Sequence, residues 1–305
     1  MALVTPALIA ALFTGFKREF QGGLDGVETQ HTKIASIIKS SSKSNTYGWL
    51  GKFPSLAKWV GDRQIKSMQA HGYQIVNEDY ESTVGVDKND IEDDELGIYS
   101  PLFQEMGNAA AIHPDELVFA MLGAGFTTLC YDGQNFFDTD HPVNAEVDGS
   151  GADVSVANMI VDADYVTANG APWFILDTSR AIKPIIYQDR KQPQLIAMTK
   201  NDDESVFMSR EFRYGVDKRC AVGFGFWQMA FAMKKALTAD SLWEAIQAMR
   251  AIEGDGGKKL GIKPTILVVP TSLEKVATRL LERELDANSS NELKGRIELL
   301  VADYL

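Results

Sequence analysis

Apolar residues at helical spacing predict one long helix, or two in succession, across residues 98 to 125. Leu102 and Met106 stand four positions apart, and Leu117 and Met121 repeat that spacing. A proline in the first turn and two glycines at the far end mark its limits. An internal proline leaves open whether the helix is continuous.

A buried strand between two helices is predicted near the C-terminal end. The stretch "KPTILVVP" is a continuous apolar run flanked by prolines, which is typical of a central buried strand. Ser241 and Glu244 form a capping-box pattern before it, and Thr271 and Glu274 form another after it. The buried face of the first helix is predicted to consist of Leu242, Ile246 and Met249.

The middle of the chain favours strands. Residues 172 to 177, 182 to 188 and 193 to 198 are short apolar runs predicted to be strands, and "WFILDTSRAIKPIIYQDRKQP" (173–193) resembles a hairpin. Residues 126 to 170, which precede them, show no sustained periodicity and are predicted to be irregular.

The N-terminal part offers less material for a core. Leu8, Leu12 and Phe16 predict an amphipathic helix that docks on a partner or packs on its own chain. Residues 21 to 51 are rich in small and polar residues, which indicates an extended arm that adds little to a core. Residues 53 to 95 combine short strand-like pieces with high charge, as in a projecting hairpin.

The composition indicates a soluble, acidic protein. The 305 residues are 45% hydrophobic and 24% charged, and the net charge of −12 opposes general nucleic-acid binding. No apolar run is long enough to span a bilayer, and the apolar N-terminus lacks the basic start of a signal peptide. Cys130 and Cys220 are predicted to be buried thiols in a reducing cytoplasm.

One cluster of residues has the chemistry of an active site. Asp132, Asp138, Asp140 and His141 could ligate a metal or transfer protons, but no phosphate loop, GxSxG, HExxH or CxxC motif accompanies them. Aspartates also close turns by bonding to backbone N–H groups, and a His-Pro pair favours an extended or turn conformation. We therefore predict a structural turn at Asp138, Asp140 and His141, with no catalytic residue, no metal and no cofactor.

Two charged segments are candidates for contacts between subunits. The run "DIEDDE" is acidic, and "RAIKP" with "QDRKQP" forms a small basic patch. In a chain this acidic, an ion-pairing surface for another subunit is the favoured use of the basic patch, ahead of nucleic-acid binding.

Several blocks of the sequence, in this order, resemble the major head subunits of phage Mu and Mu-like prophages. The resemblance extends from about residue 50 to the end of the chain. The blocks are "FPSLAKWVGDRQI", "YQIVNEDYESTVGVDKNDIEDDELGIY", "YDGQNFFDTDHPV", "SRAIKPIIYQDRKQP", "RYGVDKRCAVGFGFWQ" and "GIKPTILVVPTSLEKVA".

The resemblance implies an α+β fold of the tailed-phage major capsid (HK97) type, which encapsulins and the herpesvirus capsid floor share. In many relatives the helix–strand–helix unit precedes the long hairpin, whereas here the hairpin-like segment comes first. The implied parts are an N-terminal arm (1–45), an extended loop (46–92), a peripheral domain with a long spine helix and a long hairpin (93–140 and 171–235), and an axial domain (141–170 and 236–305).

The implied function is a structural one. Copies of the chain would assemble into hexamers and pentamers that tile an icosahedral phage head around double-stranded DNA, without specific DNA binding. Scaffold and portal proteins, and a decoration protein, would be further partners, with no role for a membrane. Assembly would take place in the cytoplasm of a bacterial host, and the product would be the virion head.

The expected functional residues are contacts between subunits. Trp59, Asp62 and Arg63 are predicted to anchor the extended loop. The acidic candidates are Glu92, Asp93 and Asp94, and the basic candidates on a neighbouring subunit are Arg180, Lys183, Arg190 and Lys191.

Two other functions remain as alternatives. A metal-dependent hydrolase would be centred on Asp138, Asp140 and His141, and an encapsulin-like compartment would be a non-viral shell built on the same fold.

Overall fold

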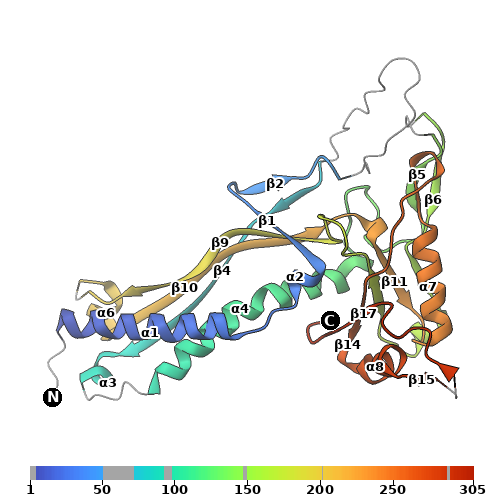
Figure 1. The fold of residues 1–305 in the computed structure, drawn as a ribbon. Coiled ribbons are helices and arrows are strands. Elements are labelled where there is room, and N and C mark those ends of the chain that lie inside the picture. The colour runs from blue at the N-terminus through green and yellow to red at the C-terminus, as the bar shows by residue number, and fades with distance from the viewer. Residues whose placement is uncertain (1–4, 51–71, 93–97, 147–149, 201, 287–288) are drawn as a thin grey trace.

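The chain forms two main sheets, one in an extended arm and one in a compact unit. The computed structural model describes residues 5–50, 72–92, 98–146, 150–200, 202–286 and 289–305. Figure 1 shows the arm running away from the compact unit, which contains the C-terminus. The helices described here do not include one long and apolar enough to cross a bilayer.

A four-stranded sheet forms the arm, with the strand order β1-β9-β10-β4. Strands β9 and β10 are both fourteen residues long and pair antiparallel, with helix α6 at the tip where the chain turns. β1 pairs parallel to one end of β9, and β4 pairs antiparallel to β10 along ten residues. The bounds are β1 Ala35–Lys39, β4 Glu78–Asp87, β9 Ile185–Met198, α6 Glu204–Ser209 and β10 Glu211–Phe224.

Two long helices cover one face of this sheet (Figure 1): α1 (Pro6–Gly26) and α4 (Ser100–Gly123). Phe16 of α1 stacks on Phe103 of α4 with ring centroids 4.1 Å apart, and both rings contact Tyr214 of β10. Of the two alternatives left open by the sequence, the N-terminal helix therefore packs on its own chain.

The long predicted helix is confirmed as one continuous element, α4. Pro114 lies inside it without ending it. The adjacent Asp115 is buried and binds the short helix α2 (His31–Ile34), because its carboxylate accepts the backbone N–H groups of Gln30 and His31 and contacts the His31 ring at 2.6 Å. This contact joins the N-terminal segment to the middle of α4.

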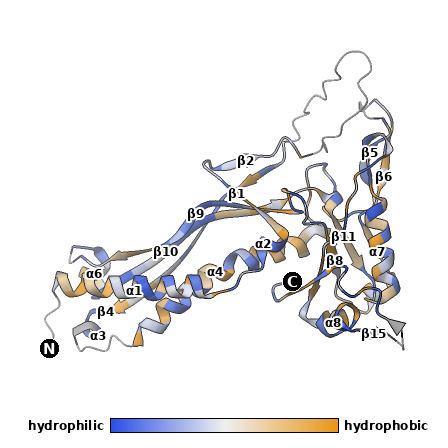
Figure 2. Ribbon diagram, in the orientation of Figure 1, coloured by the Kyte–Doolittle hydropathy of each residue, from blue (hydrophilic) through white to orange (hydrophobic). Residues whose placement is uncertain are grey.

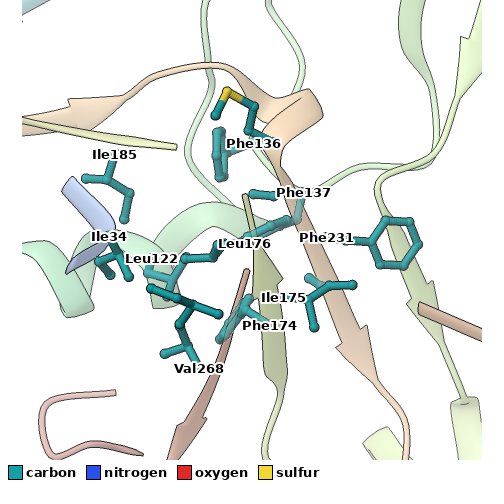
Figure 3. Close-up of a cluster of buried hydrophobic side chains, with 14 of the residues drawn as sticks. Ile34, Leu122, Phe136, Phe137, Phe174, Ile175, Leu176, Ile185, Phe231 and Val268 are labelled. Carbon is teal, nitrogen blue, oxygen red and sulfur yellow. The ribbon is translucent and has the colours of Figure 1, made fainter. Parts of the chain in front are cut away.

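A five-stranded sheet forms the compact unit, with the order β17-β14-β8-β11-β7. The predicted central strand is confirmed as β14, whose five residues are all buried between β17 and β8. Figure 3 shows the side chains of β8, including Phe174 and Leu176, among those of Leu122, Phe137 and Val268. The bounds are β7 Met159–Val161, β8 Trp173–Leu176, β11 Ala230–Lys234, β14 Ile266–Pro270 and β17 Glu298–Ala302.

Helices α7 (Ala239–Ala251) and α8 (Glu274–Glu282) pack beside this sheet. The predicted buried face of α7 is confirmed, since Leu242, Ile246 and Met249 are all buried. Both predicted capping boxes are wrong. The box of α7 starts at Thr238, one turn earlier, and α8 continues from a short 3₁₀ turn with no side-chain cap.

Shorter elements complete the fold. Strand β2 pairs with β3 beside the four-stranded sheet, and β5 pairs with β6 near α7 (Figure 1). The bounds are β2 Ser44–Thr46, β3 Gln74–Val76, α3 Lys88–Glu92, η2 Ala124–Phe126, β5 His141–Asn144, β6 Asp153–Val156, α5 Ala163–Thr167, η3 Trp227–Met229, β12 Glu253–Gly254, η4 Asp255–Gly257, β13 Lys258–Lys259, η5 Thr271–Leu273, β15 Leu285–Asp286 and β16 Ser289–Ser290.

Two expectations about the middle and the start of the chain are wrong. Residues 173 to 193 are no hairpin, because β8 lies in the five-stranded sheet and β9 in the other sheet, where it pairs with β10. Residues 21 to 51 do build core, since Ile34, Tyr47 and Leu50 are buried in the main hydrophobic cluster. Few apolar residues are enough there, because each is covered by strands distant in the sequence.

Candidate functional site

The surface of the arm carries most of the described residues predicted to contact other subunits. Trp59, Asp62, Arg63, Asp93 and Asp94 lie outside the described residues. Glu92 is the last residue of α3, and its side chain also lies outside the described part. The four basic candidates, by contrast, are all described.

Three of these four cations have partners within the chain. The Arg180 guanidinium donates to the carbonyl of Leu260 at 2.5 Å, and the Lys183 ammonium donates to the carbonyl of Thr32. Lys191 pairs with Asp217 across the β9–β10 ladder.

Arg190 differs from the other three. It is exposed, and within the described ranges neither a hydrogen bond nor an ion pair involves it. Burial along β9 also changes there, since Ile185 to Asp189 are buried and the next three residues are exposed. Arg190 therefore offers a free cation where the arm leaves the compact unit.

The opposite edge of the arm is acidic. Strand β4 is an edge strand of its sheet, and Glu78, Asp79, Glu81 and Asp87 are exposed along it. Asp79 pairs with Arg219 of β10 at 3.3 Å, which leaves most of this negative charge facing solvent. An edge strand with this charge is discouraged from pairing with arbitrary chains and is suited to a basic partner.

The tip of the arm is apolar. Phe207 and Met208 on α6 are 79% and 73% exposed, and Ile196 and Met198 near the end of β9 are 57% and 47% exposed. Figure 2 shows that hydrophilic positions otherwise run along much of β9 and β10. Soluble monomers rarely group exposed apolar side chains in this way, so the tip is a candidate contact surface.

The cluster around residues 130 to 141 is organised by Asp132. One carboxylate oxygen accepts hydrogen bonds from the Cys130 thiol at 3.0 Å and from the backbone N–H of Gln134 at 3.1 Å. The other lies 2.8 Å from Nδ1 of His141, whose side chain is fully buried. Burial would raise the pKa of Asp132, but the hydrogen bonds from His141 and Cys130 outweigh it and hold that pKa below its ordinary value.

His141 is the first residue of β5 and lies against an indole. Its ring stacks on that of Trp227 with centroids 4.0 Å apart and planes 8° apart. Its Nε2 lies 3.3 Å from Oδ1 of Asn158, which also accepts the backbone N–H of Asp138. No pattern in the sequence indicated Asn158 or Trp227 as neighbours of His141, since neither lies near residue 141 in the chain.

Asp138 and Asp140 lie outside this buried cluster and form a local turn. Asp138 accepts the backbone N–H of Thr139 at 2.7 Å and the amide of Asn135 at 3.1 Å. Burial raises the pKa of Asp138, but these bonds outweigh it and lower that pKa overall. Asp140 is fully exposed, and a hydrogen bond with Asp138 raises its pKa. The structure thus separates His141 from the two aspartates with which it was grouped and joins it to Asp132 and Cys130.

Known proteins match this chain along its whole length. Residues 9–305 match the family described as Mu-like prophage major head subunit gpT. The major capsid protein of Escherichia phage Mu is 55% identical over 307 residues, covering 99% of this chain and 100% of the relative. The Mu-like prophage FluMu major head subunit of Haemophilus influenzae is 54% identical over 310 residues, covering 100% of both.

Solved structures also match this chain over nearly its whole length. The procapsid of bacteriophage JBD30 superimposes with a TM-score of 0.86 and 51% identity, covering 99% of this chain and 100% of that one. The JBD30 capsid superimposes with a TM-score of 0.78 and 38% sequence identity, covering 99% of both chains. The JBD30 capsid decorated with minor capsid protein trimers gives 0.75 and 37%, covering 100% of both.

The fold, with its long arm and compact unit, is that of the major capsid proteins of tailed phages. Within that class, the chain belongs to the Mu-like prophage major head subunit gpT family. It is a structural capsid protein and not an enzyme. The predicted family and fold are thereby confirmed, and the hydrolase and the non-viral shell are set aside as alternatives.

Proposed function

We propose that copies of this chain form hexamers and pentamers that tile an icosahedral head around double-stranded DNA. The observation that carries this proposal is the full-length likeness to the JBD30 procapsid chain, at a TM-score of 0.86. An arm with an acidic edge, a free cation at its base and an apolar tip supplies surfaces of the kind that repeated contacts need. Weak contacts of this kind become stable when many are made at once.

Assembly is proposed to begin as a precursor shell filled with scaffold protein. The chain is more similar to the JBD30 procapsid than to either JBD30 capsid, with TM-scores of 0.86 against 0.78 and 0.75. These scores support a subunit that first adopts the procapsid-like conformation, before DNA enters the shell. Filling with DNA would then drive expansion to the final shell.

The proposed relation to DNA is enclosure without specific binding. A net charge of −12 repels the phosphate backbone, so DNA slides along the shell wall. Portal protein at one vertex, and assembly in the cytoplasm of a bacterial host, complete the proposal. A decoration protein is proposed because the JBD30 capsid carries minor capsid protein trimers.

We propose domain limits adjusted to the observed sheets. The peripheral domain would comprise the four-stranded sheet with α1 and α4, where α4 is the spine helix. Strands β8 and β11 would join β14 in the axial domain, because they share its sheet. The extended loop would start from the β2–β3 pair, and Trp59, Asp62 and Arg63 remain its proposed anchors.

Electron microscopy of the purified protein tests the proposal. Shells, or rings of five and six subunits, are expected when the protein is concentrated with or without its scaffold partner. Uniformly monomeric particles under every condition, with the chain folded by circular dichroism, would overturn it.

A further inference from the structure

Cys130, Asp132 and His141 bring together three side chains of the kinds that bind transition metals. One ligand atom from each lies within 4.8 Å of the other two. Cys130 and His141 are buried, and the side chain of Asp132 is only 8% exposed. A tetrahedral zinc ion, with bonds of about 2.0–2.3 Å, separates its ligand atoms by roughly 3.5 Å. The donor atoms therefore need only small shifts to occupy three of the four positions around such an ion, and a water molecule would occupy the fourth.

The environment of His141 points to a cation beside the ring. Asn158 is held in one orientation, since its Nδ2 donates to the carbonyls of Phe136 and Trp227 at 2.7 and 3.4 Å. Its Oδ1 accepts the backbone N–H of Asp138 and also faces Nε2 of His141. Because Nδ1 faces the Asp132 carboxylate, both ring nitrogens of His141 face oxygen acceptors.

A neutral imidazole has one proton, so it cannot satisfy both acceptors. If Nε2–H donates to Asn158, a lone pair on Nδ1 points at a carboxylate. A metal ion at Nδ1 resolves this, because the lone pair and the carboxylate then both bind it. A metal-bound histidine usually donates its other N–H to a fixed acceptor, and Asn158 occupies that position here.

We propose that Cys130, Asp132 and His141 bind a structural Zn²⁺ ion. Thiolate and imidazole ligands favour zinc over magnesium or calcium. A thiolate and a carboxylate also balance the charge of Zn²⁺, which suits a buried position.

The ion would link the turn that holds Cys130 and Asp132 to the start of β5, where the His141 ring stacks on Trp227. Cys130 and Asp132 lie in a tight turn closed by the Leu129–Asn135 bridge, and His141 begins β5. The role is structural and independent of how copies assemble. It departs from the sequence-based expectation that the chain binds no metal.

Metal analysis of matched variants tests the site. Full-length wild type, Cys130→Ser and Cys220→Ser would be incubated with zinc under reducing conditions, desalted and measured by mass spectrometry. Cys220 is the matched control, because it is also a buried free thiol but lies outside the cluster. Wild type and Cys220→Ser should retain about one zinc ion per chain, and Cys130→Ser should retain less than about a third of that.

Cobalt substitution of the wild type provides a second measurement that needs no variant. Bound Co²⁺ should produce the near-ultraviolet charge-transfer absorption of a thiolate ligand, and added zinc should abolish it. If zinc-free wild type mixed with Co²⁺ does not show this absorption, the proposal is overturned and the cluster is a hydrogen-bonded turn. Equal zinc in wild type and Cys130→Ser would overturn it as well.

Discussion

The compact unit and the arm bury their strands in different ways. All four residues of β8 are fully buried, so that strand has apolar contacts on both of its faces. In the arm, β10 alternates for much of its length, with buried residues toward α1 and α4 and more exposed ones on the other face. The compact unit is thus stabilised within the chain, whereas the arm leaves one sheet face open.

The compact unit therefore supplies most of the stability of the fold, and the arm supplies exposed surface. The main hydrophobic cluster lies in and around the compact unit, while the cluster of the arm is small and rich in aromatic residues. An arm held by few contacts can present a long charged face and an apolar tip without weakening the main core. If this division is correct, core substitutions in the two regions should differ in kind.

The largest effect is expected from Phe174→Ala. Phe174 is fully buried with its ring near Phe126 and Phe137, and removing such a ring costs about 3–5 kcal/mol. That is a large part of the roughly 5–15 kcal/mol that stabilises a typical domain. Urea titration followed by circular dichroism should show a strongly lowered midpoint.

Phe16→Ala is the matched change in the arm. It should detach α1 while the five-stranded sheet persists, and hydrogen exchange should increase in α1 and the facing part of α4. Equal, global loss of protection in both variants would show that the two regions unfold as one unit.

A somewhat smaller effect is expected from Gly107→Ala. A Cβ atom there would lie 2.1 Å from the carbonyl oxygen of Phe20, so α1 must move away from α4. Overpacking of this kind costs typically about 1–3 kcal/mol. Gly22→Ala in α1 is the control, because a Cβ there meets nothing and alanine favours the helix by about 0.5–1 kcal/mol. Thermal melting should therefore shift in opposite directions for the two variants.

Asp115→Asn should change how the free energy of unfolding depends on pH. Burial raises the pKa of Asp115, but hydrogen bonds from His31 and the backbone of Gln30 outweigh it and lower that pKa. A folded-state pKa below the unfolded one stabilises the fold above the ordinary carboxyl pKa of about 3.9, and this contribution is lost as the pH falls. The variant should be less stable at neutral pH, by about 1–3 kcal/mol.

Urea midpoints measured from pH 7 down to about pH 3 test this. The curve of the variant should be flatter than that of the wild type. Glu284→Gln is the comparison variant at an exposed carboxylate whose pKa is lowered by its hydrogen bond with Lys294. Solvent screens that pair, so this variant should flatten the curve much less than Asp115→Asn does. Parallel curves for wild type and Asp115→Asn would exclude the proposed contribution.

Elements with strong periodicity could be predicted from the sequence, and pairings between distant elements could not. Helix α4 and strand β14 carry long apolar patterns of their own, so their type followed directly. The partner of β8 could not be predicted in this way, because its partner β14 lies some ninety residues further along the chain and β9 is nearer. The short loop before β9 suggested a hairpin, but the burial of β8 on both faces requires a central position in the other sheet.

The polar cluster shows the same limit at the level of side chains. Asp138 and Asp140 stand close to His141 in the sequence, yet successive residues of an extended segment point to opposite faces, so residues one or three positions before His141 point away from its ring. The tight turn at residues 130–135 instead brings Asp132 and Cys130 to the ring. The expected burial of both cysteines is confirmed, but no pattern indicated that one of them touches Asp132.

The smallest effect on stability, and a large one on assembly, is expected from Arg190→Glu. Arg190 is exposed and lacks a described partner in its own chain, so reversing its charge should change the stability by less than about 0.5 kcal/mol. If it pairs with Glu92, Asp93 or Asp94 of a neighbouring subunit, the reversal places like charges together and should suppress shells in electron micrographs.

Lys259→Glu is the matched control, because it reverses an exposed cation on the compact unit and should leave assembly intact. Reversing Asp93 and Asp94 to lysine in the Arg190→Glu background should restore shells, since opposite charges would again meet. Normal shells from Arg190→Glu alone would exclude this pairing. The acidic edge of β4 and the apolar tip at Phe207 and Met208 would then remain as candidate contacts of the arm.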